Sequence, residues 1–129
     1  MKLRRVDLSD AREPRDVLER VVRVRTAEAA DLAFALQTRD KRDLHALRIA
    51  CKRLRYALER FEPLDSSLQP AAERLAQIQD ALGEAHDRDV LLGILPPTMP
   101  ETERRLLAER EALIDRACAL WTLAQRERG

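Results

Sequence analysis

Glycine, cysteine and aromatic residues are all scarce in this chain of 129 residues. It has three glycines, two cysteines and four aromatic residues. So few glycines leave little material for the tight turns and bulges of a β-sheet protein. Two cysteines are too few for a disulfide framework or a four-ligand zinc site. No run of 18 apolar residues occurs, so no membrane-spanning helix is expected. Ala, Leu, Arg and Glu, all strong helix formers, dominate instead and indicate an all-α protein.

The length fits one domain, because a second full core would leave too much surface for the volume. We therefore expect a single helical domain over residues 1–129, with its core at about 14–126 and an N-terminal arm at 1–13. The first residues are basic but no apolar segment follows them, unlike a secretion signal. Cys51 and Cys118 are expected to be reduced thiols. These features predict a cytoplasmic location.

The formal net charge of +1 hides an uneven distribution. Counting Lys and Arg against Asp and Glu gives +3 for residues 1–25, −2 for 26–38, +5 for 39–60 and −5 for 61–129. Such asymmetry favours one positive surface that faces a polyanion. A set of solvated helix faces is the alternative.

Apolar spacing of three and four residues predicts four long helices. The first begins near Pro14 and ends near residues 38–40, and the second runs from about Asp40 to Pro63. The third begins near residues 66–70 and ends at Gly83, where a left-handed residue is expected. An extra short helix then begins near Asp87, and the last helix follows the proline-rich residues 96–100. The predicted fold is an antiparallel four-helix bundle with one extra short helix after Gly83.

The second predicted helix carries an apolar seam and, one residue further along, a row of basic side chains. The seam repeats at steps of three and four: Leu44, Leu47, Cys51, Leu54, Leu58 and Phe61. The basic row, as we call it from here on, consists of His45, Arg48, Lys52 and Arg55. It follows the same helical repeat about 100° further around the axis and covers roughly 15 Å.

A line of cations spaced one turn apart suits a linear chain of phosphates. Arg binds phosphate oxygens bidentately, and Lys adds a mobile point charge. Three more basic residues lie nearby on the predicted helix: Lys41, Arg42 and Arg53. Tyr56 is expected on another face, which gives little support to base stacking. Ion pairing of the row with acids on a neighbouring helix remains the alternative.

Two segments resemble the signature motifs of the CHAD family, the conserved histidine α-helical domains. Residues 45–59 are similar to the family pattern His-x-x-Arg-[Val/Ile]-x-x-[Lys/Arg]-Arg-Leu-Arg-[Tyr/Ala]. Residues 82–92 are similar to Leu-Gly-x-x-[Arg/Asn]-Asp-x-x-Val-Leu-Leu. The motifs occur in the family's order and separation, and the resemblance covers about residues 15–125.

The resemblance implies a helical bundle that binds inorganic polyphosphate through a basic surface, in some members on polyphosphate granules. The family's basic helix then corresponds to His45, Arg48, Lys52, Arg53 and Arg55. Family members usually contain two four-helix halves, whereas this sequence shows one. A homodimer that restores the missing half is therefore expected, with a single half that binds more weakly as the alternative. At His86 the family often has Arg or Asn. The Glu-x-Glu-x-Lys strand of the triphosphatase domain sometimes fused to CHAD is absent from this sequence.

The remaining candidate residues give weaker signals. His86 is expected in a loop beside Asp87, with a second cationic site near a helix N-terminus as the alternative, and Asp87 is expected to cap the next helix. A metal site from His45, His86, Asp87 and Asp89 is weakly supported, and no catalytic motif or cofactor site stands out. The prediction is thus a non-catalytic polyphosphate-binding domain with no metal or cofactor and no membrane contact. The alternatives are a nucleic-acid-binding bundle and a metal-dependent phosphohydrolase.

Overall fold

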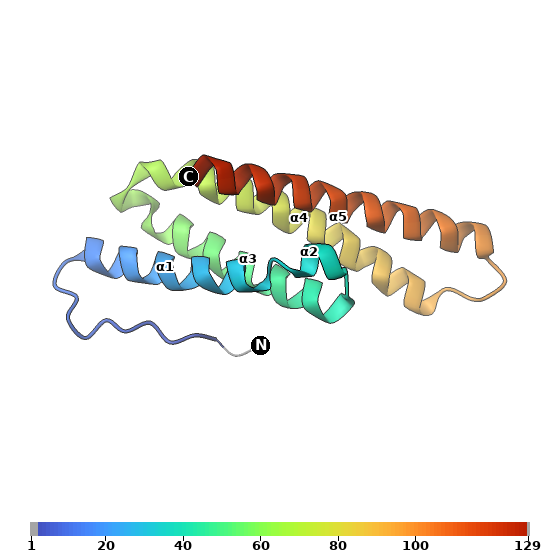
Figure 1. The fold of residues 1–129 in the computed structure, drawn as a ribbon, viewed down its shortest axis with the longest axis horizontal. Helices are drawn as coiled ribbons and strands as arrows, with labels where there is room; N and C mark the ends of the chain where they lie inside the picture. Colours follow the sequence, from blue (N-terminus) through green and yellow to red (C-terminus); the bar gives the residue numbers. More distant parts are fainter. Residues whose placement is uncertain (1–2, 129) are drawn as a thin grey trace.

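The structure, a computed structural model, describes residues 3–128 and consists of helices joined by short connections (Figure 1). The α-helices are α1 (Pro14–Leu32), α2 (Ala35–Thr38), α3 (Lys41–Phe61), α4 (Gln69–Ile94) and α5 (Pro100–Arg128). Two short 3₁₀ helices, η1 (Glu62–Leu64) and η2 (Ser66–Leu68), connect α3 to α4. The chain is 83% helical, and no strand occurs in the described part. The prediction of an all-α bundle is confirmed.

Local signals in the sequence fix where the helices begin. Pro14 takes the first position of α1, where its missing N–H costs no hydrogen bond. Asp40 caps α3, because its carboxylate accepts from the backbone N–H of Arg42 at 2.8 Å and of Asp43 at 3.3 Å. The long helices then alternate in direction, with α3 between α1 and α4, and α5 packed on α4 (Figure 1).

The extra short helix exists, but its predicted place after Gly83 is wrong. It is α2, which follows a break after Leu32 in the segment expected to be one helix. The backbone N–H of Ala33 bonds to the carbonyl of Ala30, three residues back, which tightens the last turn of α1. At Gly83 no break occurs: α4 continues to Ile94, and no described glycine has a positive φ.

The predicted seam of α3 forms the centre of the core. Leu44, Leu47, Cys51, Leu54 and Leu58 are all buried, against apolar side chains of α4 and α5. Phe61, the last member of the seam, is half-buried. Burial raises the pKa of the Cys51 thiol to about 12, so this cysteine is a neutral, small apolar group of the core.

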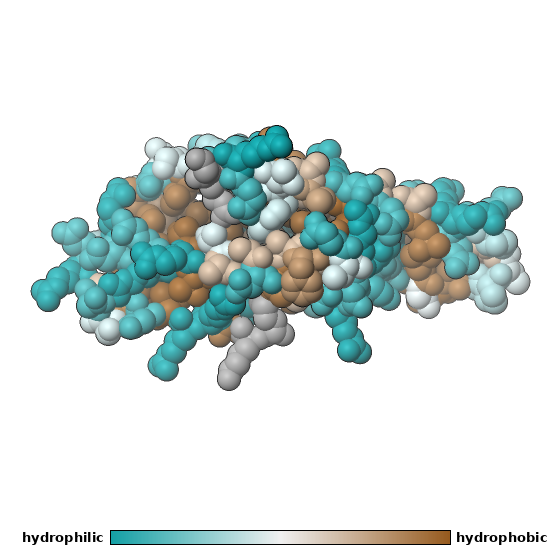
Figure 2. All heavy atoms as spheres, viewed as in Figure 1, coloured by the Kyte–Doolittle hydropathy of each residue, from teal (hydrophilic) through white to brown (hydrophobic). Residues whose placement is uncertain are grey.

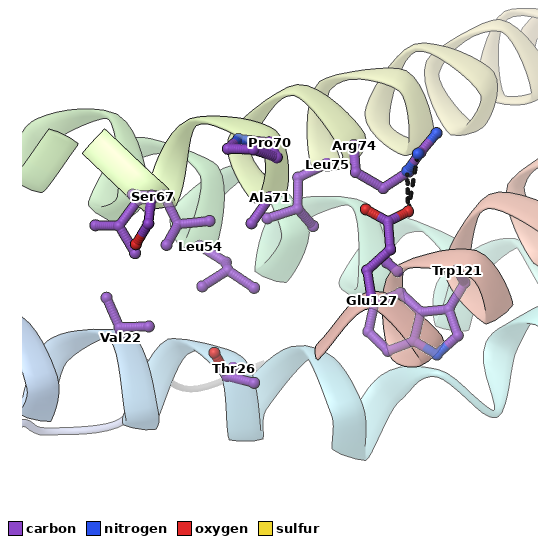
Figure 3. Close-up of a pocket in the computed structure, with 13 residues that line it drawn as sticks. Val22, Thr26, Leu54, Ser67, Pro70, Ala71, Arg74, Leu75, Trp121 and Glu127 are labelled. Atoms are coloured by element: carbon purple, nitrogen blue, oxygen red, sulfur yellow. Dashed lines mark hydrogen bonds and ion pairs between the residues drawn. The ribbon is translucent and has the colours of Figure 1, made fainter. Parts of the chain in front are cut away.

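At one end of the bundle the helices leave a cavity of about 420 Å³. Figure 3 shows its walls, which come from α1, α3, η2, α4 and α5 and include Val22, Leu54 and Trp121. The lining is mainly apolar. Arg74 donates to Glu127 at 2.8 Å, so the one cation of the cavity wall is paired. The cavity is therefore no site for a polyanion.

At the opposite end, the α4–α5 hairpin extends beyond α1 and α3 (Figure 1). Five of its apolar side chains are between 43% and 74% exposed: Val90, Leu91, Ile94, Met99 and Leu107. Figure 2 shows hydrophobic side chains at the surface of this part of the molecule. Within residues 3–128, none of the helices has a stretch both long and apolar enough to span a membrane.

Candidate functional site

The basic row lies along the line where α3 packs against α4. The His45 ring is 6.0 Å from the ring of His86 on α4, measured between centroids. One turn further, Arg48 lies over Gly83, and Arg55 donates to the side-chain oxygen of Gln79 at 3.1 Å. His45 and Lys52 are exposed, whereas Arg48 and Arg55 are half-buried. The row is therefore a surface feature supported from one side by α4.

The Arg48 side chain lies close to Gly83 of α4. A Cβ atom built at Gly83 would be 3.9 Å from Nη1 of Arg48, an ordinary contact distance, so an alanine would fit there without moving the guanidinium. This glycine, expected to end a helix, instead lies within α4 beside an arginine of α3.

Most of the row has free donors. Within the described part of the chain, His45, Arg48 and Lys52 form no side-chain hydrogen bond or ion pair. Only Arg55 is engaged, through Gln79 and through Glu59 on its own helix, with 3.2 Å between Nε and the carboxylate. This pair is half-exposed on the Glu59 side, whereas Nε of Arg55 is buried. The alternative that the row is neutralised by a neighbouring helix therefore finds no support at Arg48 or Lys52.

The other three basic candidates lie outside the basic row, each in a different place. Lys41 lies at its N-terminal end and lines a hollow with His45, Arg48 and His86. That hollow measures about 10 Å³, room for no more than one water molecule. Arg42 is exposed on the first turn of α3. Arg53 lies on the α1 side of the helix, where its positive charge reaches Glu28.

Tyr56 belongs to the row's surface, so its expected position on another face is wrong. It follows Lys52 by four residues, one helical turn, and four-residue neighbours share a face. The Lys52 Nζ atom is 5.7 Å from the centre of the Tyr56 ring, and the Arg55 guanidinium carbon is 5.3 Å from it. The ring is 47% exposed. The row therefore ends beside a half-exposed aromatic ring that has two cations near its centre.

Acidic side chains flank the row on the α4 side. An open groove of about 700 Å³ is lined by Arg48 of α3 and Arg116 of α5, together with Asp80, Glu84 and Asp87 of α4. None of these three carboxylates is within 4.0 Å of Arg48. These carboxylates repel a polyanion on the α4 side of Arg48. The path along the α3 side, past His45 and Lys52, is therefore the more favourable one.

Comparison with known families agrees with this geometry. A family model described as the CHAD domain matches residues 2–96, which contain both signature segments and the α3–α4 seam. The chain belongs to the CHAD family. No curated protein and no solved structure matches it. CHAD domains in general bind polyphosphate and are binding domains rather than catalytic ones.

In this CHAD domain, the second signature segment lies inside α4 and not in a loop. Asp87 is exposed in the middle of the helix, so its expected role as a helix cap is wrong. His86 is in the middle of the same helix and faces His45. The sequence left the role of His86 open, because the family often has Arg or Asn at this position, and the expected break at Gly83 placed it in or beside a loop. An unbroken α4, antiparallel to α3, brings the two signature histidines together.

Asp89, once a candidate metal ligand, has a structural partner. Arg110 of α5 donates through Nε to its carboxylate at 2.6 Å, and both side chains are 10% exposed. The same guanidinium donates to the backbone carbonyl of Arg39 at 2.6 Å. Arg110 therefore ties α4 and α5 to the turn before α3. Among residues 3–128, no group of three or more His, Cys, Asp or Glu side chains is arranged to hold a metal ion.

Proposed function

We propose that this CHAD domain binds inorganic polyphosphate along the basic row of α3. The supporting observation is that His45, Arg48 and Lys52 lie in one line with no ion pair or hydrogen bond in the described structure. A phosphate chain along this line would accept charge-assisted hydrogen bonds, and the counterions it releases would add to the affinity. Lys41 extends the row at its N-terminal end, while Arg42 and Arg53 act at longer range. The domain acts as a binding module in the cytoplasm, free or on polyphosphate granules.

The test is a triple variant with a charge-matched control. Arg48→Ala, Lys52→Ala and Arg55→Ala together should weaken polyphosphate binding at least about thirtyfold, equivalent to about 2 kcal/mol. The control replaces Arg23, Arg104 and Arg126, which are exposed on other helices. Both triples remove three charges, so a purely non-specific attraction would respond equally to both. Titrations at several salt concentrations, with circular dichroism to check helix content, distinguish these cases. Equal affinities of the two variants would overturn the proposal.

Two rival functions are tested in the same system. Nucleic-acid binding uses the same cations, so long-chain polyphosphate should compete with RNA and DNA at one fixed salt concentration. A phosphohydrolase would release phosphate from polyphosphate when divalent metal is added. We expect polyphosphate to displace both nucleic acids and to remain intact.

We further propose that the domain forms a homodimer through the far end of the α4–α5 hairpin. The accessible surface is 8268 Å², against about 7,000 Å² for a compact monomer of 14.8 kDa. The excess is comparable to the 800 Å² or so that each partner buries in a standard interface. The exposed apolar side chains of the hairpin, with Ile94 at 74%, supply a self-complementary patch for a two-fold contact.

A further inference from the structure

The C-terminal end of the basic row differs chemically from the rest of it. From His45 to Arg55 every member of the row is cationic or can become so. Tyr56 then presents a ring that is 47% exposed, with Lys52 and Arg55 within 6 Å of its centre. A ring with two cations near its centre is a defined aromatic surface, and because Tyr56 is 47% exposed, part of that surface stays open to a ligand.

One turn beyond Arg55 the charge along α3 changes sign. The next side chain on this face is Glu59, whose carboxylate is 47% exposed and lies 3.2 Å from Nε of Arg55. A phosphate chain that continued past Tyr56 would meet this negative charge. A neutral group with hydrogen-bond donors would instead find an acceptor there. This end of the row thus fits a ligand whose phosphates stop and whose next part is an uncharged aromatic group.

We propose that the basic row also takes nucleoside polyphosphates, with the base on Tyr56 and the phosphates along Arg55, Lys52 and Arg48. Bases stack on aromatic side chains with little regard to sequence, because every base has a π-face. Glu59 accepts hydrogen bonds from the sugar or the base. The proposal rests on the proposed function, since it uses the same cations for the phosphates.

The dimensions of the row suit a short phosphate chain that ends in one base. Tyr56 and Arg48 are eight residues apart, about 12 Å along the helix, and His45 lies about 4.5 Å further. Three cations and one histidine therefore follow the aromatic ring, which suits three or four consecutive phosphates. RNA alternates single phosphates with bases and would need further aromatic side chains, of which the row has none.

The experiment compares two ligands that differ by a nucleoside. Calorimetry measures binding of adenosine 5′-tetraphosphate and of inorganic tetraphosphate to the wild-type protein, Tyr56→Leu and Tyr56→Phe. Leu removes the aromatic face, whereas Phe keeps it. We expect Tyr56→Leu to weaken the adenosine ligand about five- to tenfold and the inorganic ligand less than twofold. Tyr56→Phe should behave like the wild type. The matched control is Phe34→Leu, which alters another half-exposed aromatic residue before α2.

Each outcome separates the two proposals. If Tyr56→Leu weakens both ligands equally, Tyr56 only orients Lys52 and Arg55, and the nucleoside proposal is overturned while polyphosphate binding stands. If Tyr56→Leu changes the affinity for neither ligand, the nucleoside proposal is overturned as well, while polyphosphate binding stands. If the adenosine ligand alone binds and depends on Tyr56, base stacking stands and the polyphosphate proposal fails. If neither ligand binds, both proposals fail. A single-stranded oligoadenylate is measured in the same way. If Tyr56→Leu weakens the oligoadenylate more than adenosine tetraphosphate, the ligand class of this site is RNA and the nucleoside proposal is overturned.

Discussion

His45 is the one imidazole of the basic row. A histidine side chain ordinarily titrates near pH 6.5, and a polyanion favours the charged imidazolium. The charged and titratable groups around it are Lys41 and Arg48 from α3, and His86 and Asp89 from α4. Asp89 is held by Arg110. The His86 ring lies 6.0 Å from the His45 ring, so a phosphate chain beside His45 also lies near a second imidazole.

We therefore expect polyphosphate to bind more tightly at pH 6 than at pH 8, and His45→Gln to remove much of this difference. In His45→Gln, the increase in polyphosphate affinity between pH 8 and pH 6 should be about threefold smaller than in the wild type. The dependence of the affinity on salt should stay nearly the same, because Arg48 and Lys52 keep their charges. Titrations at both pH values measure this. Phosphate groups of the ligand also titrate in this range. The matched control is therefore His86→Gln, which removes the facing imidazole and leaves His45 in place. A full pH response in His45→Gln would show that His45 is not in contact with the ligand.

Helical geometry alone decides the position of single residues along the row, and it predicted four of them, although Tyr56, one turn from Lys52, was wrongly expected on another face. The three–four spacing placed His45, Arg48, Lys52 and Arg55 on one face, and the structure has them so. The same geometry turns Arg53 by about 80° from His45 and toward α1. What lies opposite the row depends on how two helices pack. Gly83 and His86 therefore could not be assigned to the site from local sequence signals.

At the scale of elements, the best-predicted boundaries have strong local causes. Pro14 and Asp40 begin their helices as expected, because each acts on its own first turn. Gly83 and Asp87 are also typical of helix ends, yet α4 runs through both. Packing of α4 between α3 and α5 outweighs a glycine cost of about 1 kcal/mol, which is why local propensity gave the wrong result there.

The segment before α1 is attached to that helix through a buried carboxylate. Glu28 is 1% exposed and accepts from the backbone N–H of Arg4 at 2.8 Å and from the Arg25 guanidinium at 2.6 Å. Burial raises the pKa of Glu28, but these two hydrogen bonds and the charges of Arg25 and Arg53 outweigh it, and the pKa is lowered. A carboxyl group whose pKa is lower in the folded state stabilises the fold above its unfolded pKa, and this contribution is lost as pH falls through the folded pKa.

Glu28→Gln should therefore destabilise the domain most at neutral pH. We expect a loss of about 1–3 kcal/mol in the free energy of unfolding at pH 7, because the charged hydrogen bonds become neutral ones. The difference from wild type should shrink as pH falls through the lowered pKa of the native Glu28 carboxyl group, where that group becomes protonated. Urea unfolding across this range measures it. Glu19→Gln is the matched control, since Glu19 is exposed on the same helix. A difference that stayed constant with pH would contradict the role assigned to the Glu28 charge.

At the scale of the whole molecule, the basic row and the apolar hairpin end serve different contacts. The row lies on α3 beside α4, whereas Val90, Leu91, Ile94, Met99 and Leu107 gather where α4 and α5 extend past the other helices (Figure 1). Apolar area of this kind gains about 25 cal/mol for each Å² removed from water. A second copy of the same surface covers it by two-fold symmetry and leaves the row of each protomer open.

Ile94→Lys should convert the dimer into a monomer. A lysine at this place puts two like charges near each other across a two-fold contact, while it suits the C-terminal end of α4 in the monomer. Sedimentation at tens of micromolar should show a dimer for the wild-type protein and a monomer for the variant. Leu123→Lys, an equally drastic change at a 41% exposed position elsewhere on α5, should leave the dimer intact. A wild-type protein that stays monomeric at high micromolar concentration would exclude this interface. A dimer that survives Ile94→Lys would place the contact on another surface.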